Sequence, residues 1–102
     1  MYQSEIFAKI LQAVSEETEM SSESILSSSK ETEVVDARYL LVYFLFRQGF
    51  YPSQIARRIG KTRRSVNYML SRYHIREGSG KMMRIQRENI GKRMVPALSC
   101  CP

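Results

Sequence analysis

The sequence predicts an all-α domain that contains a helix-turn-helix, and three observations support this prediction. Apolar residues recur at helical spacings of three and four along most of the chain. Glycine, proline and N-capping residues stand where these stretches begin and end. With 102 residues, of which 43% are hydrophobic and 25% charged, the chain has the size and composition of one small globular domain.

The first half of the chain contains two predicted helices and a short helical turn between them. Residues 4–17 carry an apolar stripe on one side, which indicates an amphipathic helix. The serine-rich stretch 20–29 would form a linker with one helical turn inside it. A long helix is expected over residues 34–48, and because much of it is apolar on all sides, it should lie at the centre. Gly49 would end this helix with a positive φ.

The helix-turn-helix is predicted directly after this point. Pro52 suits a first helical position, since its missing N–H costs nothing there. A short helix over residues 53–59 would end at Gly60, and Thr62 would cap a second helix over residues 63–73. A small residue in the first helix lets the second approach. The inward-facing residues would be Ile55, Ala56 and Ile59, then Val66, Met69, Leu70 and Tyr73.

The remaining residues predict a tail. We expect residues 1–77 to form the folded helix-turn-helix domain and residues 78–102 to form a basic, flexible segment after the Gly-Ser-Gly sequence at its start. Within it, residues 81–90 could form a short helix, with Met82, Met83, Ile85 and Ile90 available to pack. The end of the chain should be frayed.

Charge is unevenly distributed along the chain. Residues 1–46 hold three Lys or Arg against eight Asp or Glu, whereas residues 47–102 hold thirteen against two. The basic half favours an anionic partner, with nucleic acid ahead of a membrane surface or an acidic protein. A merely solvated basic face is the alternative. No apolar run approaches the roughly 20 residues of a membrane-spanning helix, so we expect a cytoplasmic protein without membrane contact.

Metal and cofactor chemistry has little support. The cysteines are the adjacent Cys100 and Cys101, and the only histidine is His74. These residues cannot form a disulfide framework, and a structural zinc ion needs about four ligands at workable spacing. We therefore expect no metal and no other cofactor.

Gly60-Lys61-Thr62 matches the end of a phosphate-binding P-loop, but the match fails on its context. The first glycine of that motif would fall at Ile55, and the preceding segment predicts a helix instead of a strand. No Ser/His/Asp or Cys/His arrangement has support in the sequence. We therefore expect no ATP site, no small-molecule substrate and no enzymatic activity.

The second helix of the helix-turn-helix should present a face that suits DNA. Arginine forks, an amide and a phenol can bond to base edges and phosphates. An ordinary helical hairpin with a solvated basic face is the alternative, but it does not predict that positive charge concentrates on this one face. The exposed residues would be Arg63, Arg64, Asn67, Tyr68, Ser71 and Arg72.

Two segments resemble the C-terminal DNA-binding domain of the bacterial replication initiator DnaA. One is Ile-Leu-Ser at residues 25–27, followed after a loop by Val-Val-Asp-Ala-Arg-Tyr at residues 34–39. The other begins with Ser-Gln-Ile-Ala at residues 53–56 and continues into Lys-Thr-Arg-Arg-Ser-Val at residues 61–66. The resemblance spans residues 8–73 and implies a Trp-repressor-like helical bundle.

The resemblance also implies roles for individual residues. In that family the loop before the long helix enters the minor groove, and the second helix of the helix-turn-helix enters the major groove. Base reading would fall to Thr62, Arg63 and Arg64, with Asn67 beside them. Contacts to phosphates or the minor groove would fall to Lys30, Ser53, Lys61, Ser65, Tyr68 and Arg72.

The chain departs from that family at the residues that read DNA. Asp-His-Thr/Ser of the family is Thr-Arg-Arg here, and Lys30 is the only cation in the minor-groove loop. Because the sequence starts just before the matching segment, we expect a free-standing reader domain with altered specificity and without the ATPase module of the initiator.

The sequence therefore predicts a sequence-specific protein for double-stranded DNA that acts in replication control or transcription regulation. The alternative is a protein-interaction module that kept the fold without specific DNA reading. Such a module would dock a protein partner through its acidic first half or its tail. Steep salt dependence of duplex binding would distinguish the two.

Overall fold

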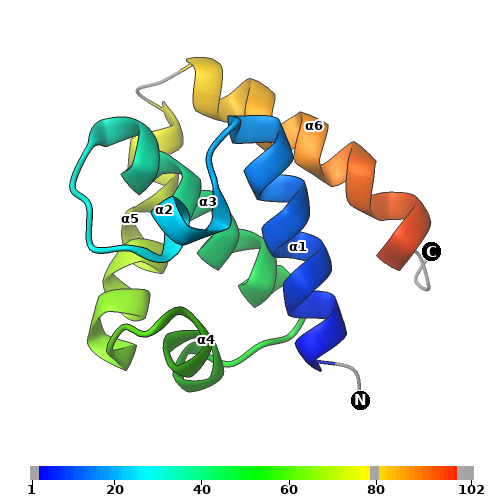
Figure 1. Cartoon of the computed structure of the whole chain (residues 1–102). Helices are drawn as coiled ribbons and strands as arrows, with labels where there is room; N and C mark the ends of the chain where they lie inside the picture. Colours follow the sequence, from blue (N-terminus) through cyan, green and yellow to red (C-terminus); the bar gives the residue numbers. More distant parts are fainter. Residues whose placement is uncertain (1–2, 79–80, 99–102) are drawn as a thin grey trace.

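The computed structural model describes residues 3–78 and 81–98, and this part of the chain forms six helices and no strand. The prediction of an all-α fold is therefore confirmed. Figure 1 shows the helices packed around α3, with α1 and α6 side by side at one edge. The helices are α1 (Gln3–Thr18), α2 (Ser22–Leu26), α3 (Thr32–Arg47), α4 (Pro52–Ile59), α5 (Arg63–Gly78) and α6 (Lys81–Leu98).

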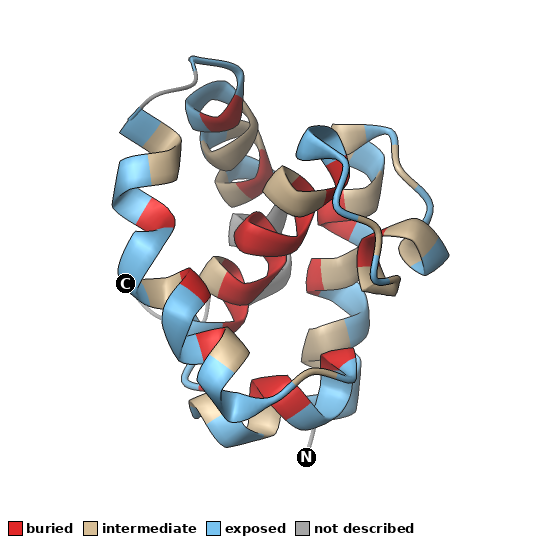
Figure 2. Ribbon diagram, turned by 90° about the vertical axis from the view of Figure 1, so that its left-hand side faces the viewer, coloured by how far each residue is buried: buried red, intermediate tan, exposed pale blue. Residues whose placement is uncertain are grey.

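Helix α3 forms the centre of the molecule, as its all-round apolar sequence predicts. It contacts α1, α2, α4 and α5, and its residues Leu40, Leu41 and Leu45 are fully buried. Figure 2 shows that the buried residues concentrate along this helix and on the sides of its neighbours that face it. Burying one such side chain contributes about 1.5–3 kcal/mol, so contacts to α3 hold the bundle together.

The predicted ends of α4 and the predicted start of α5 are confirmed. Pro52 is the first residue of α4, and Gly49 and Gly60 follow α3 and α4 with φ of +102° and +73°. Both values lie in the left-handed region, which glycine adopts without steric cost. The chain can therefore reverse sharply after each helix, and α5 folds back against α4.

The second half of the chain differs from its prediction. Helix α5 continues past Tyr73 to Gly78, and α6 runs to Leu98 in place of a short helix in a flexible tail. Met83 and Ile90 of α6 are buried in the core. Seven residues are close to two helical turns, so both side chains point to the same side, against α1 and α5. Residues 99–102, which include both cysteines, lie outside the described residues.

Polar contacts fix how α6 lies on its neighbours. Arg87 bonds Glu77 at 2.7 Å, and Arg93 lies 3.0 Å from Glu16 and 3.3 Å from Glu17. These pairs lie at the surface with their arginines partly exposed, and surface ion pairs contribute about 0–1 kcal/mol each. The buried apolar contacts therefore hold the helix, and the ion pairs set its register. None of the described helices is long and apolar enough to cross a membrane.

Candidate nucleic-acid interface

The turn between α4 and α5 is built by three consecutive residues. Gly60 supplies the left-handed backbone conformation. Thr62 caps α5, because its Oγ1 accepts a hydrogen bond from the N–H of Ser65 at 3.1 Å, which satisfies one of the free donors at a helix start. The predicted capping role of Thr62 is confirmed, and the first turn of α5 therefore has a defined position relative to α4.

The inner side of α5 anchors the helix to the core. Val66, Met69 and Tyr73 are buried, and the ring of Tyr73 stacks on that of Tyr43 with centroids 4.2 Å apart and planes 12° apart. Burial, together with the negative charge of Glu77, raises the pKa of the Tyr73 hydroxyl. These contacts hold the outer side of α5 rigidly, and a surface that binds specific bases needs side chains in fixed positions.

The outer side of α5 carries the residues predicted to bind DNA. All six of these residues are exposed, and so is Thr62, the remaining base-reading candidate. The guanidinium of Arg72 lies 5.2 Å from the ring centre of Tyr68, which is 55% exposed. A cation over an aromatic face is attracted by about 0.5–1 kcal/mol at an exposed site, so these two side chains form one unit. The six residues are Arg63, Arg64, Asn67, Tyr68, Ser71 and Arg72.

The other candidates for phosphate or minor-groove contacts fall at different places. Ser53 is exposed near the start of α4, and Ser65 is half-buried in the first turn of α5. Lys30 is exposed in the loop between α2 and α3. Lys61 is half-buried, and its Nζ donates a hydrogen bond to the carbonyl oxygen of Ser27 at 3.3 Å. The structure thus directs Lys61 toward the loop that carries Lys30.

The middle of the chain is free of negative side chains. Residues 37–76 contain nine Lys or Arg and no Asp or Glu, and this stretch covers α4 and most of α5. Charge pairs among the described residues instead involve α6 and the C-terminal part of α5. The face around the helix-turn-helix therefore has a positive potential that attracts an anion.

Sequence reasoning missed two cations of α4. Arg57 and Arg58 are exposed, and together with Ser53 they line a hollow of about 520 Å³ between α4 and the start of α1. The guanidinium of Arg58 lies 5.8 Å from the ring centre of Phe7, which turns it toward α1. The signal that indicates them is their position off the apolar stripe of α4, on the side of that helix that faces solvent.

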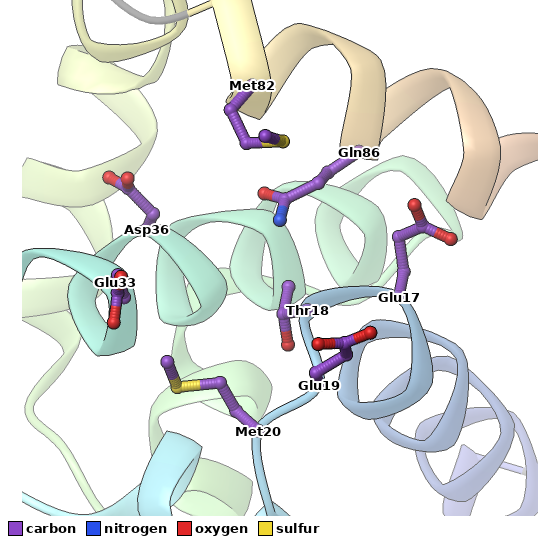
Figure 3. A pocket seen from close by; sticks show the side chains of 8 residues that line it. All are labelled: Glu17, Thr18, Glu19, Met20, Glu33, Asp36, Met82 and Gln86. Atoms are coloured by element: carbon purple, nitrogen blue, oxygen red, sulfur yellow. The ribbon is translucent and has the colours of Figure 1, made fainter.

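A second hollow, of about 500 Å³, has the opposite charge (Figure 3). Glu17 and Glu19 reach it from the end of α1 and the residue after it, and Glu33 and Asp36 reach it from α3. Carboxylates repel phosphates, so this side is unsuitable for a nucleic acid. Among the described residues no group of three or more His, Cys, Asp or Glu is arranged to hold a metal ion.

A family model matches the middle of the chain. A family described as "Putative ATPase subunit of terminase (gpP-like)" matches residues 36–89, just over half of the chain, from the first half of α3 into α6. A comparison with curated proteins gives no match. The matched segment includes the helix-turn-helix and the first half of α6 with the buried Met83. The chain therefore belongs to this family of gpP-like terminase subunits.

Proposed function

We propose that the chain binds double-stranded DNA through the exposed side of α5, as the DNA-reading domain of a protein that acts in DNA packaging. The observation that carries the proposal is the acid-free stretch over residues 37–76. It coincides with a helix-turn-helix whose second helix exposes arginine, asparagine and tyrosine side chains. These are side chains that bond base edges and phosphates.

The proposed docking places the first turns of α5 in the major groove. Arg63, Arg64 and Asn67 would read bases there, with Thr62 at the helix start, and this assignment follows the geometry of other helix-turn-helix proteins. Arg72, Tyr68 and Ser65 would hold the phosphate backbone. The resemblance to DnaA supports the same geometry and adds Lys30 as a minor-groove contact and Ser53 as a phosphate contact.

The family description supports packaging as the process, since a terminase is what it names. Replication control or transcription regulation, which the DnaA resemblance predicts, is the alternative process. A selection of bound sequences from a random duplex library gives the preferred site, and the location of that site separates these proposals. A site where the packaging of a DNA molecule begins would favour packaging, whereas a site at a replication origin or a promoter would favour the alternative.

ATP hydrolysis is the activity that the family description names, and we propose that residues 3–93 do not supply it. Gly60-Lys61-Thr62 connects two helices, and the amine of Lys61 bonds a backbone carbonyl of the protein. A phosphate-binding loop instead follows a strand, and its lysine reaches the phosphates. Millimolar ATP should therefore leave the melting temperature of the protein unchanged, and a rise would contradict this proposal.

A charge-matched pair of variants tests the DNA proposal. Arg63→Gln with Arg64→Gln removes two cations from α5, whereas Arg84→Gln with Lys92→Gln removes two exposed cations from α6. We expect about 4–6 phosphate contacts in the wild-type complex, with a slope of log K against log salt near −0.9 per contact. Fluorescence anisotropy with a selected duplex should show a much larger loss of affinity for the α5 double variant than for the α6 double variant.

Two outcomes would contradict the proposal. Equal losses for the two pairs would mean that net charge alone attracts DNA and that α5 has no special part. Absence of duplex binding at low salt would leave the protein-interaction module as the function, with the acidic hollow or α6 as its docking surface.

A further inference from the structure

A buried arginine lies beneath the loop between α2 and α3. Arg38 is 7% exposed. Its Nε donates to the carbonyl oxygen of Ile25 at 2.9 Å, and its Nη2 donates to those of Ser27 at 2.6 Å and Ser29 at 3.2 Å. A buried charge is tolerated only where hydrogen bonds replace its lost hydration. Here three backbone carbonyls supply that compensation, and in return the guanidinium fixes their positions.

The same loop is also joined to the helix-turn-helix. The carbonyl of Ser27 accepts a second hydrogen bond, from the Nζ of Lys61, which stands in the turn just before α5. Ser27 and Lys61 are 34 residues apart in the chain. One carbonyl therefore links the loop to both α3 and the start of the second helix of the helix-turn-helix.

The loop directs two side chains outward. The hydroxyls of Ser27 and Ser29 accept hydrogen bonds from the N–H groups of Ser29 and Glu31, at 3.2 and 3.3 Å, and thereby hold the loop's own backbone. Ser28 and Lys30 are exposed. Lys30 is thus exposed on a loop whose backbone is held by the loop's own serine hydroxyls and by Arg38 beneath it.

We propose that Arg38 is a positioning residue for DNA binding: it holds loop 27–31 so that Lys30 contacts the same duplex that α5 reads. Arg38 itself does not touch DNA. The inference rests on the proposed function. Its physical reason is preorganisation, because a loop that is ordered before binding does not have to lose conformational freedom on binding.

A double-mutant cycle with Arg38→Met and Lys30→Ala tests the inference. In the wild-type background, Lys30→Ala should weaken duplex binding about fivefold at 0.1 M salt and reduce the salt slope by about 0.9, as expected when one cation is lost from the DNA interface. In the Arg38→Met background, Lys30→Ala should change affinity by less than about twofold, because an unheld loop no longer presents the lysine. Non-additivity of this kind is not expected from a residue that only stabilises the fold.

Two further variants complete the experiment. Arg47→Met, on the exposed end of α3, removes the same charge and should leave the effect of Lys30→Ala at about fivefold. Arg38→Lys keeps the charge but lacks the fork geometry, so it should give an intermediate coupling, and it takes the place of Arg38→Met if that variant does not fold. Amide hydrogen exchange of residues 27–31 should speed up in the order wild type, Arg38→Lys, Arg38→Met.

The outcomes separate the inference from the function on which it rests. If wild-type protein binds DNA and the effects of Arg38→Met and Lys30→Ala are additive within about twofold, the positioning role is overturned and DNA binding stands. If wild-type protein binds no duplex, both are overturned. Unchanged loop exchange in Arg38→Met would also overturn the inference.

Discussion

Arg64 and Arg72 stand about two turns apart on α5, and their different positions predict different effects on DNA binding. The fork of an arginine near the helix start matches the O6 and N7 acceptors of guanine, and one such pair discriminates by about 1–3 kcal/mol. Arg64→Ala should therefore relax preference at one base position. Arg72→Ala should weaken all duplexes alike and lower the salt slope by about one. Competition binding with single-base variants of the site measures both effects, and uniform weakening by Arg64→Ala would leave only backbone contact for that residue.

Tyr73 makes the stability of the fold sensitive to alkaline pH. Its raised pKa means that the folded state keeps the proton at a pH where the unfolded state has lost it. The stabilisation is complete below the ordinary tyrosine pKa of about 10 and is lost as pH rises beyond it, at up to about 1.4 kcal/mol per pH unit. Chemical denaturation from pH 9 to 11 should therefore show a shallower decline for Tyr73→Phe than for wild type.

The exposed Tyr51 offers the control for this measurement. Its side chain is 69% exposed, so Tyr51→Phe should follow the wild-type decline with pH. If the stability of Tyr73→Phe declined with pH as steeply as that of wild type and of Tyr51→Phe, burial of the Tyr73 hydroxyl would have no part in the alkaline loss of stability.

At the scale of elements, helices with clear boundary signals could be predicted, whereas for α6 the sequence indicates no more than a short helix over residues 81–90 within a flexible tail. Pro52, Gly60 and Thr62 mark the ends of α4 and α5 with local chemistry, and the structure places the boundaries there. Over residues 81–93 of α6, whose side chains the structure describes, the buried residues are Met83 and Ile90, seven residues apart, which is too sparse a stripe to give a clear helical period. Its start after a Gly-Ser-Gly sequence also has the composition of a linker.

In the candidate site, too, one feature could be predicted from local sequence patterns and another could not. Exposure of the α5 face follows from the period of the buried residues on the other side of that helix, so it could be predicted. The hydrogen bonds of Arg38 and Lys61 to the α2–α3 loop join residues 9 to 34 positions apart. Such contacts depend on how helices pack, and no local pattern indicates them.

The packing of α6 predicts that it belongs to the cooperative unit. Ile90 is fully buried, whereas Ile85 on the same helix is 49% exposed. Ile90→Ala should lower the free energy of unfolding by about 2–5 kcal/mol, and removal of a buried side chain of this size leaves a cavity. Ile85→Ala should change it by much less. Thermal melts followed by circular dichroism compare the two, and equal small effects would restore the flexible tail that the sequence predicts.

At the scale of the whole molecule, the charges separate along α5. Arg63 starts the helix, and Arg76 near its other end pairs with Asp36 of the acidic hollow. Thirteen residues of helix at 1.5 Å each place these ends about 20 Å apart, in a molecule of 33 × 28 × 24 Å. The acidic side should therefore face away from a duplex bound at the start of α5.

Duplex binding at two salt concentrations tests this orientation, because salt sets the distance over which charges act. Glu19 is exposed at the acidic hollow, just after α1, and Glu19→Gln removes one negative charge there without changing loop 27–31. At 0.1 M salt the Debye length is about 10 Å, so charges near the far end of α5 are screened from a duplex at its start, whereas at 0.01 M it is about 30 Å. The variant should bind duplexes within about twofold of wild type at 0.1 M salt and tighter at 0.01 M. Anisotropy titrations at both salt concentrations measure this difference, and an equally large gain at 0.1 M would place the acidic side against the DNA and overturn the docking through α5.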